Sequence, residues 1–494
     1  YGVSMVTLYY LRRFQAFARD LFGAVQWKEI RVAEEVADLL AALTEALQNH
    51  RELLKGEISD ADRKKVLDAL GSAGGAYRER VYDGGFSGVK VTVTRTDLLA
   101  FIEVSLEWTD HTIRANRRED GLYHAYNLLT VDGDAVSITR LYEMLEGQVA
   151  VLSSGILTPE ESVEVLDALK ASDLFRPDQY SYLLYPDRDL ARFEDKNIVP
   201  NELVDSSALL TTLLSNGDTR LIVRDVEGVV HFSGSFRNRD GVSETLDDLA
   251  RSGHEALVDE EREWVIEQFE RIFDHKSYTG RSGTFFGYEG LGCVYWHMVS
   301  KLLLAAAETY QYAVEVGADD VTQGLLVDHY YSIRAGIGLN KSPDVFGAFP
   351  TDPYSHTPGN AGAKQPGMTG QVKEDILARW AELGVLVEDG CIHFRPSLLR
   401  ESEFLTEEVR YDYFDVNGVE QHVNVGPGQL AFTCCQVPVV YTKSVAEELQ
   451  VFTRDGAEVT SDLCILDAEF SRKVFDRTGE VVRIDVAVAT GLAS

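Results

Sequence analysis

Charged and aromatic side chains gather in the segment NRREDGLYHAYN, which spans residues 116–127. Four consecutive charged residues run into a glycine and then into tyrosine and histidine rings. Aromatic rings stack on the apolar faces of pyranose sugars, while carboxylates and amides hydrogen-bond the sugar hydroxyls. The segment therefore has the residue types of a sugar site, although each ring taken alone also fits a core position.

Three further clusters combine glycine or proline with polar and aromatic residues where helices would otherwise continue. They span residues 278–301, 334–340 and 349–371. Loops of this composition on a helical scaffold often carry function, and they also often serve as plain connections. We take the four clusters together as the candidate functional region.

Two of these clusters have the design of an anion site. His297 lies where a helix should begin, after a Gly-rich turn that contains Arg281 and Glu289. A helix N-terminus with such a lead-in and cationic side chains suits an anion. Thr369 could cap the next helix and present its hydroxyl together with the Gly370 N–H. The same spacings also fit ordinary capped helices with a core histidine.

Other common chemistries lack their sequence patterns. HExxH, paired-histidine and EF-hand spacings are missing, so we expect no metal and no bound cofactor. A GxSxG elbow is missing too, which argues against a serine nucleophile. The GYEGLG run at 287–292 follows no predicted strand and therefore does not fit a dinucleotide site.

The composition limits the partners of the chain. The 494 residues include 47 Lys and Arg against 80 Asp and Glu, a formal net charge of −33. Such a charge repels nucleic acid and anionic membrane surfaces, so any phosphate site must be built from a few Arg, His and backbone N–H groups. Five cysteines without a CxxC pair fit reduced thiols and a cytoplasmic location.

Helical periodicity dominates the first 400 residues. The patterns predict helices over residues 27–50 and 259–275. Another helix should begin after Thr158 as N-cap, with Glu161 completing a capping box, and a further helix should run from residue 370 to a stop at Gly384. A strand is expected at 89–96 and a hairpin at 219–234. The first residues are typical of the middle of an amphipathic helix, so we expect the chain to be part of a longer protein.

The pattern changes to period two beyond about residue 405. Alternating segments and the Asn417-Gly418 pair between two of them predict β-hairpins. We therefore expect a mainly α domain at 1–404, as a layered bundle or a toroid, followed by a small β-rich domain at 405–494.

The order of the clusters resembles a known family. Asp120-Gly121 comes first, His297 follows a glycine turn, and Thr369-Gly370 precedes a helix ending in ELGV. This order resembles the inverting β-glucan phosphorylases of the cellobiose phosphorylase type, glycoside hydrolase family ninety-four. The segments RSGTFFGYEGLGCVYWHMVSK and DPYSHTPGNAGAKQPGMTGQVKEDIL are most similar to the 1,2-β-oligoglucan phosphorylases. The resemblance covers about residues 100–400.

The resemblance implies an (α/α)6 toroid, incomplete at its N-terminal side if the opening helices and β-sandwich of the family precede Tyr1. It implies Asp120 as general acid. Family members usually carry Trp-Asn before Asp-Gly, where this chain has Arg118-Glu119. That departure leaves Glu119 and Asp178 as rivals for the acid.

Further site residues follow from the resemblance and from loop position. Phosphate would be held by His297, Thr369, Gly370 and Arg281. Substrate contacts are expected from Tyr123, Tyr288, Glu289, Gln365 and His356, and Arg334 could contact either ligand. Tyr126 could add an apolar wall beside Asp120.

The implied activity is that of a glycosyltransferase-type phosphorylase, with β-glucooligosaccharide, β-1,2-linked by resemblance, and inorganic phosphate as co-substrates. An inverting hydrolase on the same toroid stays open and would need a second carboxylate, for which Glu289 and Asp352 are candidates, at ~6.5–9.5 Å from the acid. A non-catalytic glycan-binding module also stays open. A second chain or an N-terminal segment could complete the fold, and a homodimer is possible.

Overall fold

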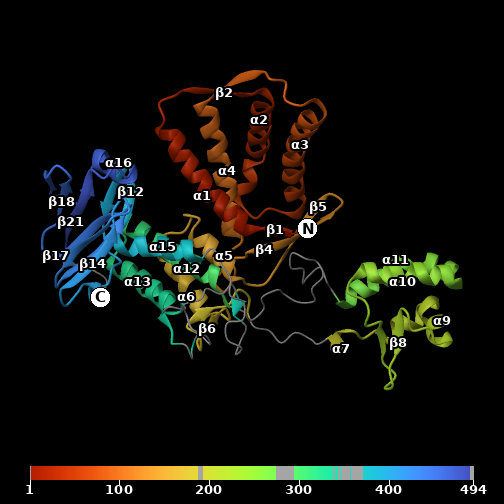
Figure 1. Ribbon diagram of the computed structural model, residues 1–494. Coiled ribbons are helices and arrows are strands. Elements are labelled where there is room, and N and C mark those ends of the chain that lie inside the picture. The colour runs from red at the N-terminus through yellow and green to blue at the C-terminus, as the bar shows by residue number, and fades with distance from the viewer. Residues whose placement is uncertain are drawn as a thin grey trace.

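The computed structural model describes residues 2–186, 193–273, 294–337, 340–342, 345, 356–357 and 371–489. Helices prevail up to Leu383, and strands prevail beyond it (Figure 1). The predicted order of a helical part and a β-rich part is therefore confirmed. Among the described residues, no helix is both long enough and apolar enough to cross a membrane.

A double layer of helices forms the centre of the molecule. The first layer is a row in which each helix packs on the next: α1 (Met5–Ala24), α5 (Leu145–Leu152), α12 (Trp296–Glu315) and α15 (Gln371–Leu383). The second layer covers this row: α4 (Arg95–Ala115) on α1, and α6 (Pro159–Ala171) and α13 (Asp320–Ala335) on α12. A closed toroid goes beyond these helices and stays a prediction.

The helices α1 and α5 begin side by side. The Met5 N–H donates to the Ala125 carbonyl over 2.9 Å. A methyl group added at Gly147, in the first turn of α5, would lie 3.0 Å from the Ala125 side chain. Ala125 therefore contacts the first turns of both helices, and the missing side chain at Gly147 leaves room for Ala125 and for the Tyr123 carbonyl.

The helices α5 and α12 also begin close together. The Leu145 N–H donates to the Leu184 carbonyl over 3.0 Å, and the neighbouring Leu183 pairs with Val294, two residues before α12. An ion pair described below links the first turns of α12 and α15. The N-termini of the whole row thus lie at one end of the central layer, called here the N-terminal end.

Short strands surround this end. A three-stranded antiparallel sheet has the order β1-β4-β5, with bounds Gly2–Ser4, Tyr126–Asp132 and Ala135–Arg140. Two-residue pairs add β6 (Phe175–Arg176) to β7 (Ser181–Tyr182) and β10 (Val294–Tyr295) to β11 (His356–Thr357). The sequence analysis did not predict β4 and β5, although Asp132-Gly133 is a hairpin signal and Gly133 has a φ of +52°.

A first excursion separates α1 from α4. It contains β2 (Glu29–Ala33), α2 (Glu34–Asn49), a 3-10 turn (Arg51–Lys55), α3 (Asp60–Gly84) and β3 (Lys90–Thr94). The helix predicted from residue 27 was wrong at its start, because Ile30 pairs with Val93 and Val32 with Val91. β-branched side chains that find a partner strand prefer the extended backbone to a helix. The strand predicted at 89–96 is confirmed.

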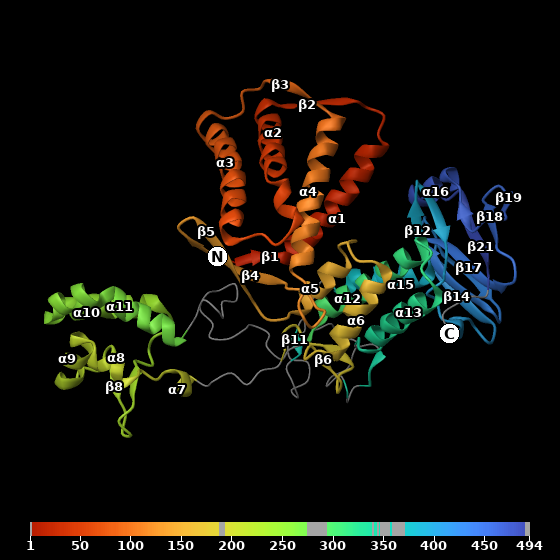
Figure 2. The same cartoon turned by 180° about the vertical axis from the view of Figure 1, so that it is seen from behind.

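A second excursion, residues 193–273, lies apart from the other elements (Figure 2). Its elements are α7 (Phe193–Lys196), α8 (Asn201–Asp205), α9 (Ala208–Asn216), β8 (Ile222–Arg224), β9 (Val230–Phe232), α10 (Arg239–Leu249), a π-helical turn (Ala250–His254) and α11 (Glu255–Phe273). They enclose a hydrophobic core of their own. The rings of Phe193 and Phe273 stack at 5.6 Å, so the excursion begins and ends at one place. The predicted hairpin and the helix at 259–275 are confirmed.

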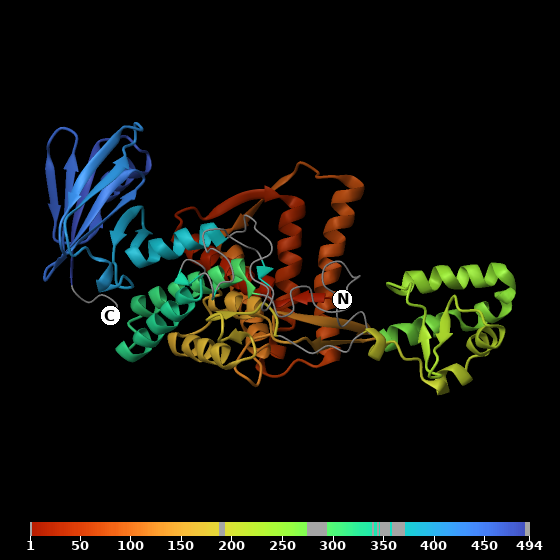
Figure 3. The same ribbon diagram turned by 60° about the horizontal axis from the view of Figure 1, so that its bottom comes forward.

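The C-terminal part is a layered β structure beside α15, opposite the second excursion (Figure 3). Its elements are β12 (Val385–Glu388), β13 (Cys391–Phe394), a 3-10 turn (Glu401–Glu403), β14 (Val409–Phe414), β15 (Glu420–Val425), β16 (Gln429–Cys434), β17 (Val437–Ser444), β18 (Glu448–Thr453), β19 (Glu458–Ser461), β20 (Ile465–Leu466), α16 (Ala468–Phe475) and β21 (Val481–Ala489).

The main sheet of this part has the order β16-β17-β21-β18-β19. The hairpin at Asn417-Gly418 joins β14 to β15, as predicted. Strands begin at Val385, before the predicted boundary at 405, because Gly384 ends α15 with a φ of +66° and the chain turns directly into β12. Residues 383–404 share one core with the later strands.

Candidate functional site

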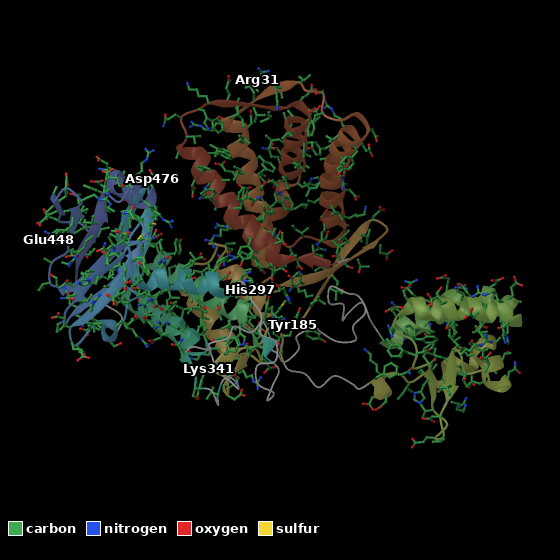
Figure 4. The ribbon with its side chains drawn as sticks, viewed as in Figure 1. Arg31, Tyr185, His297, Lys341, Glu448 and Asp476 are labelled. Atoms are coloured by element: carbon green, nitrogen blue, oxygen red, sulfur yellow. The ribbon has the colours of Figure 1, made fainter. Side chains whose placement is uncertain are left out.

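His297 lies at the N-terminal end of the row, in the first turn of α12, where α5 and α15 also pack (Figure 4). Its Nδ1 is 3.3 Å from the Tyr295 hydroxyl oxygen. Its Nε2 is 3.5 Å from Oε1 of Glu374, in the first turn of α15. The two helices therefore begin side by side, with an imidazole and a carboxylate between them. The predicted position of His297 at a helix start is confirmed.

Glu374 is buried, with only 3% of its side chain exposed. The Lys373 ammonium lies 3.3 Å from Oε1, while Oε2 has no hydrogen-bond partner among the residues that the structure describes. The next residue, Asp375, accepts a long hydrogen bond of 3.4 Å from the Ser300 hydroxyl. Burial, aided by the charge of Glu374, raises the pKa of Asp375. A buried and a partly buried acid thus follow one another in the first turns of α15.

The charge on His297 depends on opposing groups. Burial lowers its pKa, and the positive charges of Lys301 and Lys373 act in the same direction. Glu374 raises the pKa without cancelling the other effects, so the net shift is downward. An anion placed beside this ring would favour its protonated form.

Carboxylates from three helices lie around Tyr10 of α1. Tyr10 is 38% exposed, and its partial burial raises its pKa, as do the charges of Glu308, Glu146 and Glu374. The carboxylate of Glu146 accepts a hydrogen bond of 2.8 Å from Tyr126. The row therefore presents polar groups from α5, α12 and α15 on one side of α1, beside Tyr126, one of the predicted aromatic walls.

Asp120 lies in a tight turn after α4. Gly121 has a φ of +84°, and the Leu122 N–H donates to Asp120 Oδ1 over 3.1 Å. The Arg118 guanidinium donates to both carboxylate oxygens, with a shortest distance of 2.7 Å, and also to Glu143 over 3.1 Å. Burial raises the pKa of Asp120, but the hydrogen bonds from Arg118 and Leu122 outweigh it and the net shift is downward. The carboxyl is 45% exposed and ion-paired, not held in an apolar pocket.

Tyr123 supports this turn from the core. Its ring is 1% exposed and meets the ring of Tyr9 edge to face at 6.4 Å. Its backbone exchanges two hydrogen bonds of 2.8 Å with the Gln148 amide. Tyr123 therefore fixes the turn that carries Asp120 and does not face solvent.

The other residues singled out in the sequence are placed as follows. Glu119 is exposed on the turn, Asp178 is ion-paired with Arg176 over 2.9 Å, and Arg334 is ion-paired with Glu382 over 2.9 Å.

Several predicted site residues lie outside the described residues. They are Arg281, Tyr288, Glu289, Asp352, Gln365, Thr369 and Gly370. His356 is described by its backbone alone, which pairs with Tyr295 in the β10–β11 ladder. That pairing brings the chain at His356 beside the strand that leads into His297. Gly370 directly precedes Gln371, the first residue of α15, in the sequence.

The sequence analysis missed Glu374, Glu146 and Tyr295. Glu374 follows Thr369 in the predicted helix start, where an acidic residue ordinarily complements the helix dipole. Its contact with His297 joins two helices and has no local signal. In the described ranges no group of three or more His, Cys, Asp or Glu side chains is arranged to hold a metal ion.

A match to a known protein family agrees with the architecture of the second excursion. A family model described as GH149 phosphorylase insertion domain 2 matches residues 190–276. This segment coincides with the second excursion and its separate core. No curated protein matches the chain.

The matched description names a GH149 phosphorylase, not glycoside hydrolase family ninety-four, and it names no glycosidic linkage. The match thus agrees with the class of activity predicted from the motifs, and it does not extend to family ninety-four in particular. The match supports a chain from a glycoside phosphorylase family, acting on carbohydrate and phosphate.

Proposed function

We propose that the chain is the catalytic part of an inverting glycoside phosphorylase. It would cleave β-linked glucooligosaccharides with inorganic phosphate and release α-glucose 1-phosphate. The main support is the arrangement of α12 and α15, which begin side by side with His297 between them. Two helix N-termini with a histidine attract an anion through their free N–H groups and aligned dipoles.

In this proposal His297 binds phosphate together with Thr369, Gly370 and Arg281. Lys301 and Lys373 lie close enough to His297 to lower its pKa. They add positive charge in a chain whose net charge is −33. Cationic side chains beside the ring are what an acidic protein needs to hold phosphate, and Lys373 is at the same time paired with Glu374.

The chemical step uses one protein acid. Asp120 gives its proton to the glycosidic oxygen while a phosphate oxygen attacks the anomeric carbon from the opposite face. The bond from the anomeric carbon to the leaving oxygen breaks as the bond to phosphate forms. Phosphate is the nucleophile, so the protein supplies no base and acts by positioning.

The ion pair with Arg118 sets a condition on this step. A carboxylate whose pKa is lowered by a guanidinium is a poor proton donor at neutral pH. The proposal therefore requires Arg118 to leave Asp120 when substrate and phosphate bind. Glu143 already accepts a hydrogen bond from Arg118 and could retain it.

The assay is the release of glucose 1-phosphate from β-1,2-glucooligosaccharides by the full-length protein, with and without phosphate, beside β-1,3- and β-1,4-linked panels. We expect phosphate-dependent release, with β-1,2 linkages as the first choice from the resemblance. Asp120→Asn should reduce the rate by about 10²–10⁴-fold, and Glu119→Gln should retain it.

Other results would point elsewhere. Free glucose formed without phosphate would indicate the inverting hydrolase, with Glu289 or Asp352 as candidate base. An inactive Glu119→Gln beside an active Asp120→Asn would transfer the acid to Glu119. Binding of glucan without any turnover would leave the glycan-binding module.

A helical partner for α1 is part of the proposal. Phe14 and Phe17 are 63% and 60% exposed, and Tyr10 and Leu21 extend the same stripe along the helix. An exposed apolar stripe of this length is typical of a covered surface. Either a further segment of the same polypeptide or a second copy of the chain could cover it.

A further inference from the structure

We propose that Glu374 is a positioning residue, which holds the Nε2 atom of His297 and so directs Nδ1 toward the phosphate. This inference rests on the proposed function. It assigns a role to an acid whose side chain is only 3% exposed.

The two nitrogens of His297 have different surroundings. Nε2 is buried and lies 3.5 Å from the Glu374 carboxylate. This distance is short enough for an ion pair, but the two groups do not form a hydrogen bond. Nδ1 faces the neutral hydroxyl of Tyr295 at 3.3 Å. A phosphate oxygen can replace a neutral hydroxyl as the partner of an imidazolium N–H, because the charged pair is the stronger one. Nδ1 is therefore the atom available to the phosphate.

Two buried atoms at this contact lack a hydrogen bond within the described part of the chain. They are Nε2 of His297 and Oε2 of Glu374, the carboxylate oxygen next to the Oε1 atom that faces the ring. A buried carboxylate with an unused oxygen is costly unless a donor satisfies it. A protonated His297 that moves slightly toward Glu374 would complete a hydrogen bond from Nε2 to Oε1 and offset the charge of the carboxylate, and contacts in unliganded sites often shorten in this way when ligands bind.

The charged groups around the ring explain why the acid is needed. Lys301 from α12 and Lys373 from α15 disfavour the imidazolium, as burial does. Glu374 favours the imidazolium. Asp375, the next residue of α15, accepts a hydrogen bond from the Ser300 hydroxyl. Tyr295 of β10, which also contacts the ring within the described residues, is neutral. Replacing Glu374 by a neutral group leaves the two lysines unopposed, and His297 then loses its proton at lower pH.

The test compares Glu374→Gln with the wild-type full-length protein. We expect the KM for phosphate to rise about 10-fold or more, with kcat at saturating phosphate and the KM for glucan within a few fold. The basic limb of kcat/KM for phosphate should move to lower pH. Glu374→Asp, which keeps the charge, should give a smaller rise in KM and a limb close to wild type.

Two controls separate positioning from packing. Glu382→Gln removes another buried, ion-paired acid of α15, which pairs with Arg334 and Arg379. It should lower stability and leave the KM for phosphate unchanged. In a His297→Gln background, Glu374→Gln should add no further rise in KM, because the acid acts through the ring.

Each remaining outcome counts against the inference. An unchanged phosphate KM in Glu374→Gln, equal losses for both substrates, identical behaviour of Gln and Asp variants, or an additive effect on His297→Gln would overturn it while leaving the phosphorylase intact. A wild-type protein that forms no product with phosphate would overturn the proposed function itself, and the inference with it.

Discussion

At the scale of single residues, the ion pair between Arg118 and Asp120 controls the proposed acid. Arg118→Met should raise the pKa of Asp120, because it removes the main hydrogen bonds that lower it. A general acid works in its protonated form, so the basic limb of the kcat/KM profile for glucan should move to higher pH.

Arg117→Met is the matched control, since the neighbouring Arg117 pairs with Glu164 and not with Asp120. It should leave the profile in place. If Arg118→Met leaves the pH profile unchanged, the group that titrates in its basic limb is not Asp120.

His124, in the same segment, makes stability depend on pH. Burial lowers its pKa to about 4, and the charges of Arg118 and Arg140 act in the same direction. In the unfolded chain a histidine has a pKa of about 6.5. Between these values only the unfolded chain binds the proton, so the free energy of unfolding should fall as pH falls from about 6.5 to about 4.

The measurement is urea unfolding across this pH range. His124→Asn keeps a donor for the Leu141 carbonyl, which lies 3.1 Å from Nδ1, and should lose this part of the pH dependence. His422→Asn, at an exposed position of β15, should keep it. A His124→Asn protein with the wild-type pH dependence would refute the assignment.

At the scale of elements, Gly384 decides how α15 passes into β12. Its φ is +66°, and an added Cβ would lie 2.1 Å from the backbone of Arg395. Gly384→Ala should therefore reduce the free energy of unfolding by about 3 kcal/mol or more, from backbone strain and overpacking together.

Gly428→Ala provides the comparison for this prediction. Gly428 has a φ of +74° and open space around an added Cβ, so the change should cost only about 1–2 kcal/mol for the left-handed backbone. Equal losses in both variants, measured by urea unfolding, would show that the contact with Arg395 relaxes and does not matter.

At the scale of the whole molecule, the second excursion should fold without the rest of the chain. It has a separate hydrophobic core, and its ends meet at Phe193 and Phe273. A fragment of residues 193–273 should show helical circular dichroism and a cooperative thermal transition. A fragment with Leu246→Asp, at a fully buried position, should lose the transition.

The converse experiment tests the remaining chain. A short linker that replaces residues 193–273 should leave a cooperative transition for the helical and β-rich parts. A fragment without a cooperative transition would instead mean that the excursion needs contacts with the rest of the molecule.

Local signals in the sequence predicted the elements that depend on local interactions. Thr158 and Glu161 form the predicted capping box, Gly384 ends α15 in the left-handed conformation, and Asn417-Gly418 turns a hairpin. Each of these needs only residues within a few positions of one another. The same local rules failed at 29–33, where pairing with a distant strand prevailed over helical periodicity.

The sequence by itself determined which residues could do chemistry and that His297 begins a helix. Only the tertiary structure decided what those residues meet: Glu374 faces His297, and Arg118 pairs with both Asp120 and Glu143. The physical reason is that helical periodicity and capping act over three or four positions along the chain. The contact of α12 with α15, in contrast, depends on how separate helices pack, and the pKa values at the site depend on the burial and charges which that packing creates.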